Sequence, residues 1–182
     1  MTIINQNQKF ITNYFNEWIN IFTKKHYWKL HLESLKNKNR IDNILNILND
    51  IKKWVFKMNY NEDINWGDFN IYTEAILSYN SGEQLANYRY KKLNKKSVIL
   101  DRLDTINSID WEDDNIFLEW LGSYMLFDFI KKMSSKNFKN ITIYMNLTSF
   151  WFYSKILKLF KQELLIKDYM IEKESLYIEI KL

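Results

Sequence analysis

The chain has 182 residues, of which 47% are hydrophobic and 17% aromatic, and its formal net charge is +4. This apolar content provides a packed core and excludes global disorder, and the length fits a single domain over 1–182. The absence of Cys excludes disulfides, thiolate zinc sites and a cysteine nucleophile. Apolar runs are too short for a signal peptide or a membrane span, so we expect a cytoplasmic protein with no membrane partner.

Helical periodicity dominates the first half of the chain. Apolar residues recur every three or four positions over 10–22 and 40–58, and this spacing returns over 69–79 and 83–93. The segment 59–68 is rich in Asn and Asp, which predicts a turn. We therefore expect mostly helices connected by polar loops in this half.

The periodicity changes toward the C-terminus. A short strand is expected over 97–100, and an apolar helix follows from Asp110 to about Met133. The β-branched alternation of 141–146 predicts a strand, Ser149 is a candidate helix cap, and 168–182 has the alternation of a hairpin.

These elements predict an α+β protein. Its helix-rich N-terminal two-thirds would pack with a small C-terminal sheet, ordered β-α-β-β over about 141–182. No internal repeat and no low-complexity linker interrupts the chain, which again favours one domain.

The charges are divided unevenly along the chain. Residues 1–58 carry ten basic and four acidic side chains, residues 59–128 carry six and thirteen, and residues 129–182 carry ten and five. A central acidic segment thus lies between two basic ones. Such a segment is usually a solvated surface, but it can also engage a basic partner.

The densest acidic region is 101–119, where seven carboxylates accompany one Arg. Acidic residues in the first turn of a helix are stabilised by its free backbone amides, which explains only part of the cluster. We expect the remainder to contact a cationic partner, with tryptophans as buried anchors. The predicted partner-binding residues are Asp101, Asp104, Trp111, Glu112, Asp113, Asp114 and Glu119, together with Glu62, Asp63, Trp66 and Asp68 of the nearby turn.

Most enzyme and cofactor signatures are missing from the sequence. The two histidines, His26 and His31, do not have the spacing of a zinc motif and lie among lysines. Only three glycines are present, and none forms a phosphate-binding loop. No Ser has the setting of a triad nucleophile. We expect no metal, no cofactor and no catalytic residues.

The leading functional hypothesis is a stoichiometric inhibitor. Lys, Ile and Asn, which have AT-rich codons, are abundant, and this favours a gene carried on a mobile genetic element. Combined with the acidic segment, it predicts an immunity or antitoxin-like protein that neutralises a basic toxin, such as a nuclease, by protein–protein interaction. The oligomeric state is left open.

Two alternatives remain. The segment 88–96, YRYKKLNKK, interleaves aromatic and basic residues, as a small nucleic-acid-binding module would require. A weaker alternative is a metal-dependent nuclease, because Asp168, Glu179 and Lys181 have the D-x10-E-x-K spacing on two predicted strands.

Overall fold

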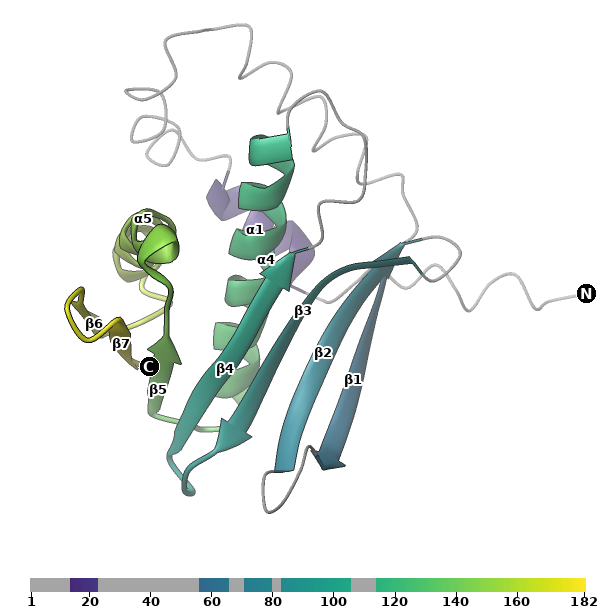
Figure 1. Cartoon of the computed structure of the whole chain (residues 1–182). Helices are drawn as coiled ribbons and strands as arrows, with labels where there is room; N and C mark the ends of the chain where they lie inside the picture. Colours follow the sequence, from purple (N-terminus) through teal and green to yellow (C-terminus); the bar gives the residue numbers. More distant parts are fainter. Residues whose placement is uncertain (1–13, 23–55, 66–70, 80–82, 106–113) are drawn as a thin grey trace, which may run out of the picture.

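The computed structural model describes residues 14–22, 56–65, 71–79, 83–105 and 114–182, and within them seven strands form one sheet (Figure 1). The strands are β1 (Phe56–Asn65), β2 (Ile71–Tyr79), β3 (Glu83–Lys92), β4 (Ser97–Thr105), β5 (Asn140–Tyr144), β6 (Asp168–Glu172) and β7 (Tyr177–Lys181). The helices are α1 (Phe15–Phe22), α4 (Asp114–Ser135) and α5 (Phe150–Gln162), with a short 3-10 turn, η1, at Leu147–Ser149.

The strands lie in the order β1-β2-β3-β4-β5-β7-β6. All neighbouring strands are antiparallel except β4 and β5, which run parallel. A parallel pair needs a long crossover, and α4 supplies it between these two strands. The last strand, β7, inserts between β5 and β6, so the C-terminal hairpin completes the sheet.

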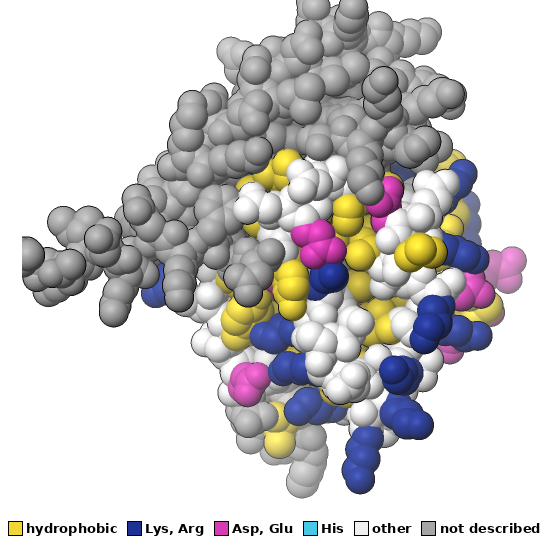
Figure 2. All heavy atoms as spheres, turned by 180° about the vertical axis from the view of Figure 1, so that it is seen from behind, with side chains coloured by type: hydrophobic (Ala, Val, Ile, Leu, Met, Phe, Trp, Pro, Cys, Tyr) yellow, Lys and Arg dark blue, Asp and Glu magenta, His cyan; other side chains and the backbone are white. Residues whose placement is uncertain are grey.

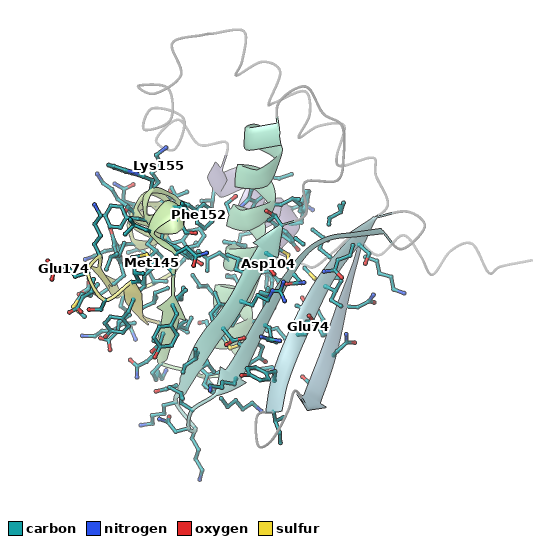
Figure 3. All side chains as sticks on the ribbon, in the orientation of Figure 1. Glu74, Asp104, Met145, Phe152, Lys155 and Glu174 are labelled. Atoms are coloured by element: carbon teal, nitrogen blue, oxygen red, sulfur yellow. The ribbon has the colours of Figure 1, made fainter. Side chains whose placement is uncertain are left out.

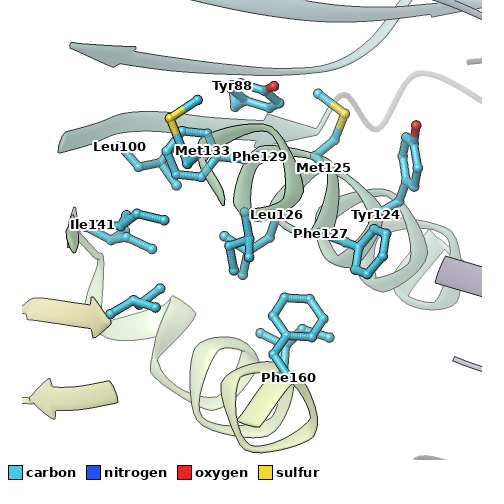
Figure 4. Close-up of a cluster of buried hydrophobic side chains, with 14 of the residues drawn as sticks. Tyr88, Leu100, Tyr124, Met125, Leu126, Phe127, Phe129, Met133, Ile141 and Phe160 are labelled. Carbon is cyan, nitrogen blue, oxygen red and sulfur yellow. The ribbon is translucent and has the colours of Figure 1, made fainter. Parts of the chain in front are cut away.

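One hydrophobic core joins the three helices to the sheet. Every residue of 121–130 is buried, which explains why this stretch of α4 is apolar on all sides. In Figure 4, Phe127 of α4 and Phe160 of α5 face each other, with ring centroids 6.0 Å apart. Ile141 of β5 and Tyr88 of β3 belong to the same cluster. Within the described part of the chain, no helix has the length and apolarity that crossing a membrane requires.

The predicted fold class is wrong, because the sheet is neither small nor confined to the C-terminus. The segments 69–79 and 83–93, expected as helices, form β2 and β3, and the predicted turn at 59–68 is largely β1. The expected strand at 97–100 extends to Thr105. The predicted helix over 40–58 falls mostly outside the described residues.

A bulge explains why the spacing of apolar residues in β3 was taken for that of a helix. The register between β2 and β3 shifts next to Leu85, so Leu85 and Ala86 are adjacent and both buried. Apolar positions 85, 86, 88 and 90 therefore no longer alternate and mimic helical spacing. The C-terminal elements, where alternation is regular, were expected with the correct type and order: strand, helix and hairpin.

Candidate functional site at the parting of β4 and β5

The two parallel strands separate part-way along their length. They pair only from Ser97 to Leu100 on β4 and from Asn140 to Ile143 on β5, although β4 continues to Thr105. In Figure 1 the two strands diverge beyond this point. In sheets of this kind, ligands bind outside the carboxyl ends of parallel strands, where neighbouring connections diverge. The parting is therefore the candidate site.

A bulge in β4 lies at the point of separation. Arg89 and Tyr90 of β3 are opposite Arg102 and Leu100, so Asp101 is the extra residue of β4. A bulge bends its strand and ends regular pairing, which turns the last part of β4 away from β5. The Arg89 side chain donates to the Asp101 carboxylate over 2.9 Å and stacks on the Tyr72 ring at 4.7 Å.

Two polar side chains on different elements are coupled electrostatically at this end of β4. Tyr153 of α5 is buried, and burial, followed by the negative charge of Asp104, raises the pKa of its hydroxyl well above the ordinary value. The hydroxyl therefore stays protonated at neutral pH. Figure 3 labels Asp104 on β4 and Phe152, the residue before Tyr153, on α5 across the parting. Asp104 is also ion-paired with Arg102.

Asn87 of β3 adds a third polar group. It is directly opposite Asp104 in the β3–β4 register, so the two side chains share a face of the sheet. Asn87 is only 8% exposed, and its side-chain oxygen has no hydrogen-bond partner among the residues that the structure describes. Sequence reasoning missed both Asn87 and Tyr153, because nothing local distinguishes them from ordinary strand and helix residues.

The predicted partner-binding residues do not form one cluster in the described residues. Asp101 and Asp104 lie on β4, each paired with an Arg, while Glu62 of β1 binds Lys136, the residue after α4, at 3.2 Å. Asp63 lies in β1, and Asp114 and Glu119 lie in α4, with side chains outside the described part. Trp66, Asp68, Trp111, Glu112 and Asp113 fall outside the described residues altogether.

The basic residues gather at the other end of β4. Exposed lysines come from the β3–β4 turn and from the end of α4, and Figure 2 shows Lys and Arg concentrated over the lower part of the helix-covered face. Lys139 donates its backbone N–H to the Lys96 carbonyl over 2.8 Å, which brings the two segments together. Tyr88 and Tyr90, however, are buried in the core. They cannot stack on bases, so the predicted nucleic-acid-binding module is wrong.

The nuclease alternative is also unsupported. Asp168 is opposite Lys181 at the end of the β6–β7 pair and accepts a hydrogen bond from Lys161 over 2.7 Å. Among the described residues, no three His, Cys, Asp or Glu side chains come together in a way that would hold a metal ion.

Comparison with known proteins yields structural similarities only. No family model and no curated protein matches the sequence. A GNAT family acetyltransferase from Staphylococcus aureus superimposes with a TM-score of 0.40 at 13% identity, over 95% of this chain and 96% of that one. A GNAT family acetyltransferase from Elizabethkingia anophelis with acetyl-CoA bound gives 0.42 at 11% identity, over 70% and 97% of the two chains.

A third similarity involves a toxin. The AtaT toxin, bound to the C-terminus of the antitoxin AtaR, superimposes with a TM-score of 0.37 at 12% identity, over 69% of this chain and 91% of that chain. None of these similarities assigns the chain to a family. The strand order, the single parallel pair and its parting are observed directly in the chain itself.

The inhibitor hypothesis is wrong. Asp101 and Asp104, two of the carboxylates that it assigned to a basic partner, are each paired with an Arg of the same sheet. The similar structures are acetyltransferases, and AtaT is the toxin of its pair rather than the antitoxin. At these TM-scores they lend no support to the inhibitor hypothesis or to the expectation of a protein without catalytic activity.

Proposed function

We propose that the chain is an acyltransferase that moves an acyl group from a pantetheine thioester to an amine where β4 and β5 part. The observation that carries the proposal is the loss of β4–β5 pairing beyond Leu100 and Ile143, at the Asp101 bulge, while β4 continues to Thr105. Within the described part of the chain, this leaves the backbone of 102–105 without a strand neighbour on the β5 side.

That free strand edge fits the arm of the donor. Pantetheine is an extended chain with two amide groups, and an extended chain can pair with an open strand edge through main-chain hydrogen bonds. When bound, the thioester would supply an activated acyl group. The residues that would hold the arm are the backbone groups of 102–105, beside the Tyr153 side chain of α5.

The phosphate end of a coenzyme A donor fits less well. The connection from β4 to α4 contains Asp110, Glu112 and Asp113 and no glycine, whereas phosphates favour glycine-rich loops and cationic partners. The proposal therefore concerns the thioester arm. We expect the phosphates of the donor to contribute little to binding.

The side chains at the parting have complementary roles in this proposal. The Asp104 carboxylate, which is still 38% exposed beside Arg102, attracts a cationic acceptor. The neutral amine attacks the thioester carbonyl and the C–S bond breaks; the Tyr153 hydroxyl, which burial keeps protonated, gives its proton to the departing sulfur and regains one from the acylated nitrogen. With no cysteine to protect or pair, we place this activity in the cytoplasm.

The test measures donor binding and thiol release. Acetyl-CoA and S-acetylpantetheine are titrated against the protein by calorimetry, and thiol release is then followed with spermidine as the amine. We expect kcat/KM for the two donors to agree within about tenfold, since a phosphate site would separate them further.

Variants at two tyrosines complete this experiment. Tyr153→Phe should lower kcat by about 10²-fold or more with little change in KM, as loss of a proton donor does. Tyr144→Phe is the matched control, because Tyr144 is 62% exposed on β5. The proposal fails if neither donor binds at millimolar concentration, or if Tyr153→Phe releases thiol as fast as the wild-type protein.

A further inference from the structure

Asn87 is an unusual residue to find buried between two strands. A buried side-chain amide normally has hydrogen-bond partners, because an unpaired polar atom loses its water without compensation. The Asn87 side-chain oxygen is buried and has none. An apolar side chain of similar size would pack there at a lower cost in folding free energy. The buried amide therefore indicates a ligand that completes its hydrogen bonding.

The residues around Asn87 indicate the chemical class of this ligand. The cross-strand neighbour of Asn87 on β4 is Asp104, a carboxylate. Its neighbour on β2 is Ile76, which offers no polar group. The negative charge of Asp104 in turn helps to raise the pKa of the Tyr153 hydroxyl. A carboxylate and an amide oxygen on one face of the sheet are both acceptors, so the missing partner is a donor with positive charge.

A primary ammonium meets this requirement. It carries three N–H donors and one charge, so it can satisfy the Asn87 oxygen and the Asp104 carboxylate at the same time. A divalent cation does not, because calcium and magnesium need about six oxygen ligands and this pair offers few.

We infer that Asn87 and Asp104 bind an ammonium group of a polyamine acceptor, apart from the neutral amine that attacks the thioester, with Asn87 selecting an N–H donor over other cations. The inference rests on the proposed function and names the side chains that hold its acceptor amine. Arg102 is ion-paired with Asp104 and already offsets part of its negative charge. Charge attraction to Asp104 therefore does not select one cation over another. The Asn87 oxygen, which needs an N–H donor, is the group that favours an ammonium.

The experiment titrates the ¹⁵N-labelled protein with spermidine and follows the side-chain amide signal of Asn87. Methylammonium and tetramethylammonium, which carry the same single charge with and without N–H donors, are titrated in parallel. We expect spermidine and methylammonium to shift the Asn87 signal in a saturable way, and tetramethylammonium to leave it unchanged at equal concentration. An equal shift with methylammonium and tetramethylammonium would overturn the inference.

Two leucine variants separate binding from folding. Asn87→Leu should weaken spermidine binding at least tenfold, yet melt at an equal or higher temperature, because it removes an unpaired buried acceptor. The control is Asn59→Leu on β1, which lies in the same row of the sheet on the far side of Ile76. It should bind spermidine as the wild type does. Unchanged binding by Asn87→Leu would refute the inference.

The results also distinguish this inference from the proposed function. If acyl donors fail to bind while spermidine shifts Asn87, the acyltransferase proposal falls and the ammonium site stands. If the donors bind and thiol is released while spermidine leaves Asn87 unmoved, the acyltransferase proposal stands and the role of Asn87 is refuted.

Discussion

At the scale of single residues, the most unusual group is Asp128, a fully buried carboxylate on α4. The Tyr60 hydroxyl lies 3.1 Å from each of its oxygens, and the Tyr88 hydroxyl donates to one of them over 2.9 Å. Burial and the Asp128 charge raise the pKa of both tyrosines well above the ordinary value. One turn further, the Lys132 ammonium lies 3.0 Å from the centre of the Tyr60 ring.

Lys132 makes the stability of the protein depend on pH. Burial, helped by the charge of Lys136, lowers the pKa of Lys132 to about 8, although Asp128 acts in the opposite direction. Between pH 8 and 10 the unfolded chain therefore binds a proton that the folded chain does not. The free energy of unfolding should rise with pH in this window, by about 1 kcal/mol after allowance for partial exposure.

Replacing this lysine tests the prediction. Lys132→Met should remove the rise, as measured by urea unfolding at pH 7.5, 8.5 and 9.5. Lys131→Met is the control, since the Lys131 ammonium instead binds Glu17 over 2.9 Å, and it should keep the rise. A Lys132→Met protein whose stability still increases with pH as in the wild type would assign the effect to other groups.

At the scale of elements, the packing of α4 against α5 positions the candidate site. Gly122 of α4 faces the ring of Phe152, and a Cβ there would lie 3.4 Å from two ring atoms. Phe152 precedes Tyr153 in α5, so the distance between these helices determines where the tyrosine hydroxyl lies.

Two substitutions of Gly122 should have opposite effects. Gly122→Ala places a methyl group in ordinary contact with Phe152 and adds helix propensity, so we expect up to about 1 kcal/mol of stabilisation. Gly122→Ile adds atoms that the Phe152 ring already occupies, which should cost about 1–3 kcal/mol and lower thiol release by moving Tyr153. Thermal melts and the thiol assay measure both effects. Equal stability of the two variants would mean that the helices are not in close contact.

At the scale of the whole molecule, one sheet and one core connect the C-terminal hairpin to the strands before it. Ile180 of β7 is fully buried and lies between Ile141 of β5 and Tyr169 of β6. A single domain over 1–182 stays a prediction, and it has a direct consequence for unfolding.

Ile180→Ala should destabilise the entire protein rather than the hairpin alone. Loss of a buried isoleucine costs about 2–4 kcal/mol, and in a single domain the Trp fluorescence and far-UV dichroism transitions should shift together. Lys181→Ala, on the exposed side of the same strand, is the control and should leave the midpoint unchanged. Separate transitions for the two probes would show that the hairpin unfolds by itself and would refute the single domain.

The sequence by itself determined the elements whose side chains follow a regular period. The alternation of β7 and the apolar stripe of α5 are local patterns, and both elements formed where they were expected. The strands β2 and β3 were expected as helices because a bulge at Leu85 interrupts the alternation, and β1 was expected as a turn because its sequence is rich in Asn and Asp. Of β4, only 97–100 was expected as a strand, and the Asp101 bulge lies just beyond it.

Only the tertiary structure decided the candidate site. Asn87, Asp104 and Tyr153 come from β3, β4 and α5, and no spacing in the sequence relates them. They share one region because β4 and β5 run parallel, and a parallel pair requires the long crossover through α4 that brings distant segments to the same end of the sheet. The acidic cluster was visible in the sequence, and so was Arg102, which lies two residues from its partner Asp104 on β4. The pairing of Asp101 with Arg89 of β3, however, depends on cross-strand register and bulge geometry, which are properties of the assembled sheet.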